Sequence, residues 1–162
     1  MTQSVIARRN AGGASYEIDI AKDRLDIGLI HDFLSRCSLW ARGIPRDVLD
    51  KAIANSLCFG LYRDRQQVGF ARLVTDEATF AYLADVFLVA EHRNTGLGQF
   101  LVEAILAWEP LQGLRRWLLV TSKAASLYRR CGFTDLVSSC NYFERFEPNA
   151  YAAGTSEMAA AD

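Results

Sequence analysis

Residues 86–101 of this chain read VFLVAEHRNTGLGQFL. An apolar run typical of a buried strand leads into a polar loop that contains Gly96 and Gly98, and helical periodicity follows. The first backbone N–H groups of a helix have no partner inside the helix and carry a partial positive charge. Because glycines let a ligand approach the backbone closely, the stretch predicts a turn that binds phosphate or diphosphate.

Two better-known phosphate motifs do not fit this loop. A dinucleotide fingerprint needs a third small residue where this chain has Leu101, and an acidic residue near the apolar run 118–120. A P-loop needs Gly-Lys-Ser/Thr, which the sequence lacks. The remaining alternative is a tight strand-to-helix turn whose glycines serve only the turn.

Periodicity on both sides of the loop predicts an α/β domain with a mixed sheet. The expected strands are Tyr16–Ile20, 57–63, 67–75, 79–89 and 116–121, with one or two closing strands between 136 and 146. The expected helices begin near Asp26, at Pro45 and after the glycine loop, and the last spans 124–130. We divide the chain into a flexible segment 1–15, a domain 16–147 and an Ala-rich tail 148–162.

Composition restricts the partners and the compartment. Eighteen basic and nineteen acidic residues give a net charge of -1, which favours neither nucleic acid nor an anionic membrane surface. The start of the chain lacks the apolar core of a secretory signal, and the apolar run 80–90 is too short to span a bilayer. The cysteines are scattered without metal-ligand spacing. We therefore predict a cytoplasmic protein and no metal site.

A second motif follows the glycine loop, at residues 127–133, which read LYRRCGF. Together, the Arg93-x-x-Gly96-x-Gly98 loop and this motif resemble the GNAT superfamily of N-acetyltransferases, in which an Arg/Gln-x-x-Gly-x-Gly/Ala loop precedes a helix and Leu-Tyr-x-x-x-Gly-Phe follows a later strand. The resemblance extends from about Tyr16 to Phe146.

The resemblance implies a GNAT-like single domain with a central mixed, mostly antiparallel sheet flanked by helices. It also implies acetyl-CoA as the acyl donor. Backbone amides of the loop would hold the pyrophosphate, and a strand segment would hydrogen-bond the pantetheine arm. The residues carried over for the loop are Arg93, Asn94, Thr95, Gly96, Leu97, Gly98 and Gln99, and those for the strand are Asp85, Val86 and Phe87. Many members carry a cofactor-contacting Asn where this chain has Thr121, whose hydroxyl supplies only part of that bonding.

The resemblance places the general acid at Tyr128. A phenol stays protonated at neutral pH and can give a proton to a leaving thiolate; the alternative is that Tyr128 only packs beneath the cofactor. Asp85 is the candidate base, because it is a carboxylate within an apolar strand. A structural role for Asp85, a base acting through water, or no dedicated base stay open. His31, His92 and Glu91 are weaker candidates.

The acceptor pocket of such a fold draws on the first two helices and their connection, so Trp40, Arg42 and Tyr82 are candidate substrate contacts. For Trp40 the favoured alternative is ordinary packing beneath the loop. The expected reaction is acetyl transfer to the amine of a small molecule or an amino-acid-like acceptor. A CoA-binding regulatory module without turnover and a protein N-acetyltransferase are the alternatives. The sequence leaves a homodimer open.

Overall fold

The computed structural model describes residues 4–136 and 141–152, which fall into two compact units. The first, here the sheet unit, comprises residues up to Leu25 and the segment Asn55–Thr134. The second, here the helical unit, comprises Asp26–Ala54 and the residues from Asp135 onward. No helix of the described residues has the length and hydropathy that a membrane crossing requires.

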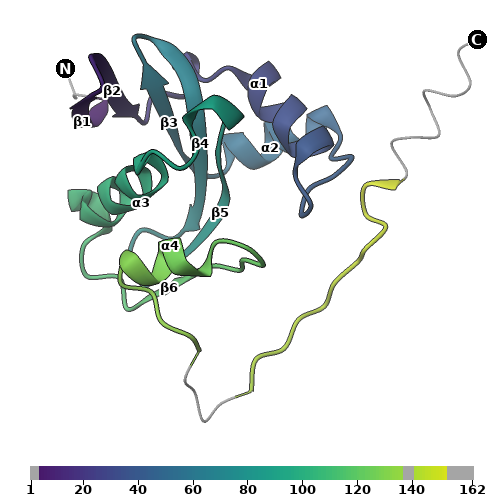
Figure 1. Ribbon diagram of the computed structural model, residues 1–162. Coiled ribbons are helices and arrows are strands. Elements are labelled where there is room, and N and C mark those ends of the chain that lie inside the picture. The colour runs from purple at the N-terminus through teal and green to yellow at the C-terminus, as the bar shows by residue number, and fades with distance from the viewer. Residues whose placement is uncertain (1–3, 137–140, 153–162) are drawn as a thin grey trace, which may run out of the picture. The chain divides into compact units, whose positions relative to one another are not determined.

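The sheet unit is built on six strands in the order β1-β2-β3-β4-β5-β6 (Figure 1). The strands are β1 (Val5–Ala11), β2 (Ala14–Asp19), β3 (Leu57–Arg63), β4 (Gln66–Thr75), β5 (Phe80–Leu88) and β6 (Arg116–Leu118). Neighbouring strands run antiparallel except β5 and β6, which are parallel. The predicted mixed, mostly antiparallel sheet is confirmed.

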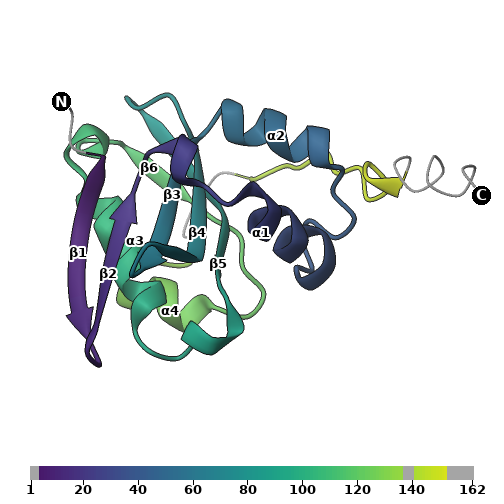
Figure 2. The same cartoon turned by 90° about the horizontal axis from the view of Figure 1, so that it is seen from above.

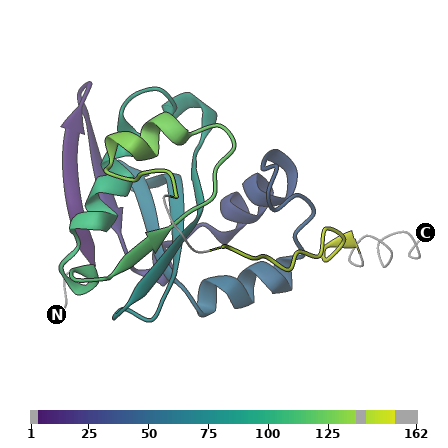
Figure 3. The same ribbon diagram turned by 90° about the horizontal axis from the view of Figure 1, so that it is seen from below.

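Two helices share the core with this sheet, α3 (Leu97–Ala107) and α4 (Ala125–Arg130). They lie next to each other against the sheet, as Figure 3 shows in green. The apolar stripe of α3 is fully buried at Leu101 and Ile105, and it packs with sheet residues such as Phe59. Removing such side chains from water is the main stabilising contribution to the unit, about 25 cal/mol for each Å² of apolar surface.

The segment 1–15, for which we predicted flexibility, instead contributes β1, which forms a hairpin with β2 (Figure 2). Gly12 and Gly13 take positive φ values of 57° and 77°, as a hairpin turn requires. Across the hairpin Arg8 Nε lies 3.6 Å from a carboxylate oxygen of Glu17. The prediction of a flexible segment was wrong because the polar run 8–10 gains its strand conformation by pairing with β2. The composition of residues 8–10 alone does not indicate this pairing.

The helical unit begins with α1 (Ile27–Asp32), which continues as a π-helical turn over Phe33–Cys37. The Asp26 side chain accepts a 2.9 Å hydrogen bond from the Leu29 N–H and so caps α1. Helix α2 (Arg46–Ala54) follows Pro45, whose carbonyl accepts a bond from the Leu49 N–H. The two predicted helices are therefore present.

The predicted closing strands are absent from the residues that can be judged, Leu136 and 141–146. Residues 137–140 and the end of the predicted tail, 153–162, lie outside the described residues. Phe143 is 90% exposed and Phe146 is 73% exposed. Apolar side chains alone do not make a strand, because a strand also needs a backbone partner, and the described part of this segment has no ladder.

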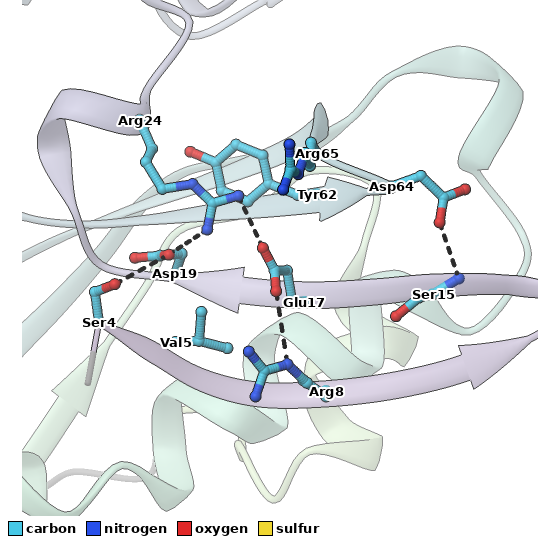
Figure 4. A pocket seen from close by; sticks show the side chains of 10 residues that line it. All are labelled: Ser4, Val5, Arg8, Ser15, Glu17, Asp19, Arg24, Tyr62, Asp64 and Arg65. Atoms are coloured by element: carbon cyan, nitrogen blue, oxygen red, sulfur yellow. Dashed lines mark hydrogen bonds and ion pairs between the residues drawn. The ribbon is translucent and has the colours of Figure 1, made fainter.

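One side chain of β2 is a buried carboxylate, Asp19, at the edge of a charged cavity of about 660 Å³ (Figure 4). Asp19 accepts from the Ala21 N–H at 2.8 Å, from the Ser4 hydroxyl at 3.2 Å and from Arg24. Arg24 also pairs with Glu17 at 2.8 Å. Burial of Asp19 opposes ionisation, yet these hydrogen bonds outweigh it and hold the pKa of Asp19 below its usual value.

We expect Asp19→Asn to lower the free energy of unfolding by about 2 kcal/mol at pH 7, because it removes one member of a buried charged pair. A depressed native pKa contributes stability that is complete above the unfolded pKa and is lost as the pH falls through the native pKa. The difference in the free energy of unfolding between wild type and Asp19→Asn should therefore become smaller below about pH 4. Urea unfolding of both proteins across this pH range measures that difference.

The matched control is Asp23→Asn, an exposed carboxylate nearby in the same unit. An equal loss of stability in both variants, or a gap for Asp19→Asn that does not change with pH, would contradict the role given to Asp19.

Candidate functional site

The glycine loop connects β5 to α3 through a short 3₁₀ turn at Ala90–His92. After this turn the backbone becomes left-handed twice, at Asn94 with φ 58° and at Gly96 with φ 80°. Gly96 is the N-cap residue of α3, and its carbonyl accepts the first helical bond from the Phe100 N–H at 3.1 Å. A left-handed N-cap favours glycine, since a Cβ at this φ is strained.

The first turn of α3 presents unpaired backbone donors. Among the described residues, none accepts a hydrogen bond from the N–H groups of Leu97, Gly98 or Gln99, and no side chain caps the helix. The first turn also contains no acidic residue. These donors and the helix dipole together suit an anion.

Gly98 is not required by the packing of the protein itself. A Cβ added there would lie 3.6 Å from the nearest atom, Leu127 Cδ2, which is ordinary van der Waals contact. Its φ is not in the left-handed region either. The missing side chain therefore leaves space at the helix start, where a bound diphosphate would need the backbone to be bare.

Side chains around the loop hold its shape. Arg93 Nε donates to the Leu88 carbonyl at 3.1 Å, and the Thr95 hydroxyl donates to the His92 carbonyl at 2.7 Å. On the helix, Gln99 connects to α4, because Arg130 Nε lies 3.4 Å from its Oε1. The exposed guanidinium of Arg93 adds positive charge at the loop.

Strand β5 separates from β6 next to this loop. The parallel pairing of the two strands ends at Tyr82 and Leu118, whereas β5 continues to Leu88. Asp85, Val86 and Phe87 lie in this second half of β5, beyond the end of the ladder with β6. The edge of a strand beyond the end of a ladder is the kind of place where an extended ligand can add to a sheet by β-augmentation.

A β-bulge interrupts the other side of β5 at the same level. Phe70 pairs with Phe87 and Arg72 pairs with Ala84, so Asp85 and Val86 together face one residue of β4. Asp85 takes a positive φ of 52°, an uncommon backbone for a residue other than glycine. Such local strain clusters at functional sites.

The Asp85 carboxylate does not point into an apolar environment. Arg72 Nε donates to Asp85 Oδ2 at 2.7 Å, and Arg72 Nη1 donates to the Ser56 hydroxyl at 3.1 Å. The side chains of Arg72 and Asp85 are 18% and 8% exposed. A partly buried ion pair of this kind fixes both groups, because the loss of one partner leaves an unpaired charge.

Tyr128 lies in α4 and belongs to the main core. Its ring packs edge-to-face with Phe133 at a centroid distance of 5.9 Å. Burial raises the pKa of the Tyr128 phenol to about 12, so that the group is protonated at neutral pH. No described residue hydrogen-bonds its hydroxyl, which leaves the proton available to a ligand. Its neighbour Leu127 approaches Gly98, so the second motif lies beside the glycine loop.

Thr121 lies just before α4, where its hydroxyl accepts a 3.1 Å bond from the Ala124 N–H. That bond uses one lone pair, and the hydroxyl proton can still be donated. Thr121 therefore holds the turn before the last helix, and its contact with a cofactor stays a prediction.

The candidate acceptor residues occupy different units. Tyr82 is half-buried on β5 of the sheet unit. Trp40 and Arg42 are exposed residues between the π-helical turn and α2 of the helical unit. Of the weaker base candidates, His31 Nε2 lies 2.9 Å from the Ile44 carbonyl, and His92 packs against Tyr16.

Sequence reasoning missed Arg72, which pairs with the Asp85 carboxylate, and Ser56, whose hydroxyl accepts a hydrogen bond from Arg72. A signal was present, since Arg72 is the one basic residue in the apolar run 68–74 of the neighbouring predicted strand. Two opposite charges in adjacent apolar strands predict a cross-strand pair. The bulge that brings Arg72 and Asp85 into register has no comparable signal in the sequence.

Comparisons with known proteins agree on one family. The family model for the acetyltransferase (GNAT) domain matches residues 54–135. A curated protein of Gibberella zeae, named as an acetyltransferase, is 36% identical over an alignment of 110 residues, with a coverage of 55% of this chain and 61% of that protein. The chain thus matches less than two thirds of that relative's length.

Solved structures extend the comparison. A GNAT-family acetyltransferase from Xanthomonas campestris pv. campestris is 46% identical, with a TM-score of 0.81 over 85% of this chain and 96% of that one. A predicted acetyltransferase from Clostridium acetobutylicum, solved with acetyl-CoA, is 16% identical, with a TM-score of 0.58 over 80% of this chain and 96% of that one. The latter match shows a shared fold alone. By the family model, the Xanthomonas structure and the loop and strand geometry described above, this chain belongs to the GNAT family of acetyltransferases.

Proposed function

We propose that this chain is an acetyl-CoA-dependent N-acetyltransferase that moves the acetyl group to the amine of a small molecule or an amino-acid-like acceptor. The observation that carries the proposal is the start of α3, where unpaired N–H donors follow a left-handed glycine next to the separated edge of β5. Acetyl-CoA, when bound, supplies an activated thioester. The protein supplies binding, orientation and protons.

The loop residues Arg93–Gln99 hold the diphosphate in this proposal, and β5 aligns the pantetheine arm. The main-chain donors at Leu97 and Gly98 are fixed by the helix, so that little ordering is needed when the ligand binds. Asp85, Val86 and Phe87 present strand hydrogen-bonding groups, with the bulge controlling their direction. Thr121 adds a hydroxyl near the start of α4.

We expect Gly96→Val to weaken CoA binding by about a hundredfold or more, because a β-branched residue does not tolerate a φ of 80° and the first helical donors would turn away. Isothermal titration with CoA measures the change. Gly113→Val is the matched control, since Gly113 has a similar φ of 84° and no neighbour within 4 Å of an added Cβ. If the wild-type protein shows no saturable CoA binding, or if Gly96→Val and Gly113→Val bind CoA with the same affinity, the proposed site is wrong.

Tyr128 is the proposed general acid. Its phenol is protonated over the physiological range because burial raises its pKa to about 12. The hydroxyl can therefore donate to the sulfur as the thiolate leaves. A merely structural Tyr128 would contribute through its ring, which a Phe preserves.

Replacing Tyr128 by Phe is thus expected to lower kcat by about a hundredfold while the affinity for CoA changes little. The assay is free-thiol release with the most active member of a panel of amines that includes amino acids and peptides with free N-termini. An unchanged kcat would remove Tyr128 as the acid. A wild-type protein that binds CoA but never releases thiol beyond the bound amount would instead be a binding module.

Asp85 is the proposed base, held in direction by Arg72 and by the bulge. A base has to collect the proton that an ammonium acceptor loses before or during attack. Asp85 lies on the half of β5 that is separated from β6, which is where thioester and amine meet in this proposal.

For Asp85→Asn we expect kcat to fall about tenfold or more, because the amide accepts no proton. Asn keeps the shape of the side chain and tolerates a left-handed backbone, so the bulge should persist. Thiol release and the melting temperature are measured together. A kcat equal to that of wild type would assign Asp85 to a structural ion pair only.

Trp40, Arg42 and Tyr82 are the proposed acceptor contacts. A guanidinium binds a carboxylate through two parallel hydrogen bonds, which favours acceptors that carry an acid as well as an amine. Comparing thiol release with peptides that have free N-termini and with small-molecule amines distinguishes protein acetylation from acetylation of small molecules.

A further inference from the structure

Arg9 of strand β1 reaches the start of α3 from the N-terminal hairpin. Its Nη1 atom donates to the Gly96 carbonyl at 3.3 Å, and its guanidinium carbon lies 5.9 Å from the centre of the Phe100 ring. The two contacts hold the guanidinium against the left-handed turn. A Cβ added to Gly96 would meet Arg9 Nη1 at 3.6 Å and Nη2 at 3.7 Å, so the charge lies directly beside this residue.

The position of this charge is electrostatically unfavourable without a ligand. A helix N-terminus carries about half a positive charge, and a nearby cation opposes it. Here Arg9 lies at the N-terminus of α3, whose first turn contains no acidic side chain. Exposed arginines usually avoid such a place, and an anion bound to the same turn would reverse the sign of the interaction.

We propose that Arg9 is a positioning residue for the cofactor diphosphate: it holds the Gly96 turn and adds a positive charge beside the bound anion. The proposal rests on the proposed function of the loop. It gives the N-terminal hairpin a part in cofactor binding, since Arg9 connects β1 to α3 across a long stretch of sequence.

The neighbouring Arg8 provides a matched control. Successive side chains of a strand point to opposite faces, and Arg8 pairs with Glu17 instead of approaching the loop. Figure 4 shows Arg8 beside Glu17 in the charged cavity. Both arginines are exposed residues of the same strand, and they differ in the face of the strand on which the side chain lies.

The test compares Arg9→Gln, Arg9→Glu and Arg8→Gln by titration with CoA and with 3′-dephospho-CoA, at low and high salt. We expect Arg9→Gln to weaken binding of both ligands by about tenfold at low salt, and Arg9→Glu to weaken it by about a hundredfold. The loss should shrink as salt rises, because an exposed charge is screened. Arg8→Gln should bind as wild type does.

Arg9→Glu separates a charge effect from a structural one. A carboxylate favours a helix N-terminus, so the ligand-free melting temperature should hold within about 3 °C while affinity falls. Gln keeps an N–H donor but has no charge, so a purely structural role predicts that any loss of affinity in Arg9→Gln does not depend on salt.

Wild-type affinity in both Arg9 variants would overturn the proposal, as would an equal loss in Arg8→Gln or a loss restricted to the ligand with the 3′-phosphate. These outcomes leave the proposed function intact. That function fails separately, if the wild-type protein itself binds neither ligand.

Discussion

The first turn of α3 imposes the constraint on which the site depends. A helix cannot satisfy its own first N–H groups, and here neither a capping side chain nor another described residue does so. The left-handed backbone at Gly96 begins the helix that carries these donors, after the loop that follows β5. An anion that satisfies them binds to fixed groups, which is why a diphosphate suits this place better than a neutral ligand.

The rest of the sheet unit positions this turn and the strand before it. β6 pairs with β5 only as far as Tyr82 and Leu118, and the bulge at Asp85 bends β5 beyond that point. The Arg72–Asp85 ion pair connects the bulge to β4. Strand edge, bulge and helix start therefore form one continuous structure, and the buried face of α3 keeps the helix in place.

Much of this architecture follows from local patterns in the sequence. The strands from Leu57 to Leu88 and helix α3 have strong periodicity, and each appears within a residue or two of its predicted ends. The β1–β2 hairpin and the Arg72–Asp85 pair were not predicted, because both depend on partners that pairing and a bulge bring together. The prediction of closing strands was wrong for the same reason. In the described part of that segment, the apolar residues have no neighbouring strand with which their backbone pairs.

The roles of the site residues rest on a different kind of inference. The motifs predicted where a diphosphate would bind, and the structure gives that loop its donors and its left-handed turn. The assignments of Tyr128, Asp85 and the acceptor contacts stay predictions. The position of Arg9 has no signal in the sequence, because a single arginine in a polar run is indistinguishable from its neighbours.

The connection between β3 and β4 leaves room for engineering a more robust protein. Asp64 and Arg65 form a two-residue turn with φ values of 47° and 78°, a conformation for which Asn-Gly is the preferred sequence. An Asn at position 64 would keep an oxygen for the Ser15 N–H, which Asp64 now accepts at 3.4 Å. The thermal stability of the protein can thus be increased at this hairpin while α3, α4 and β5 keep their sequence. Such a change in stability leaves the residues of the proposed site unaltered.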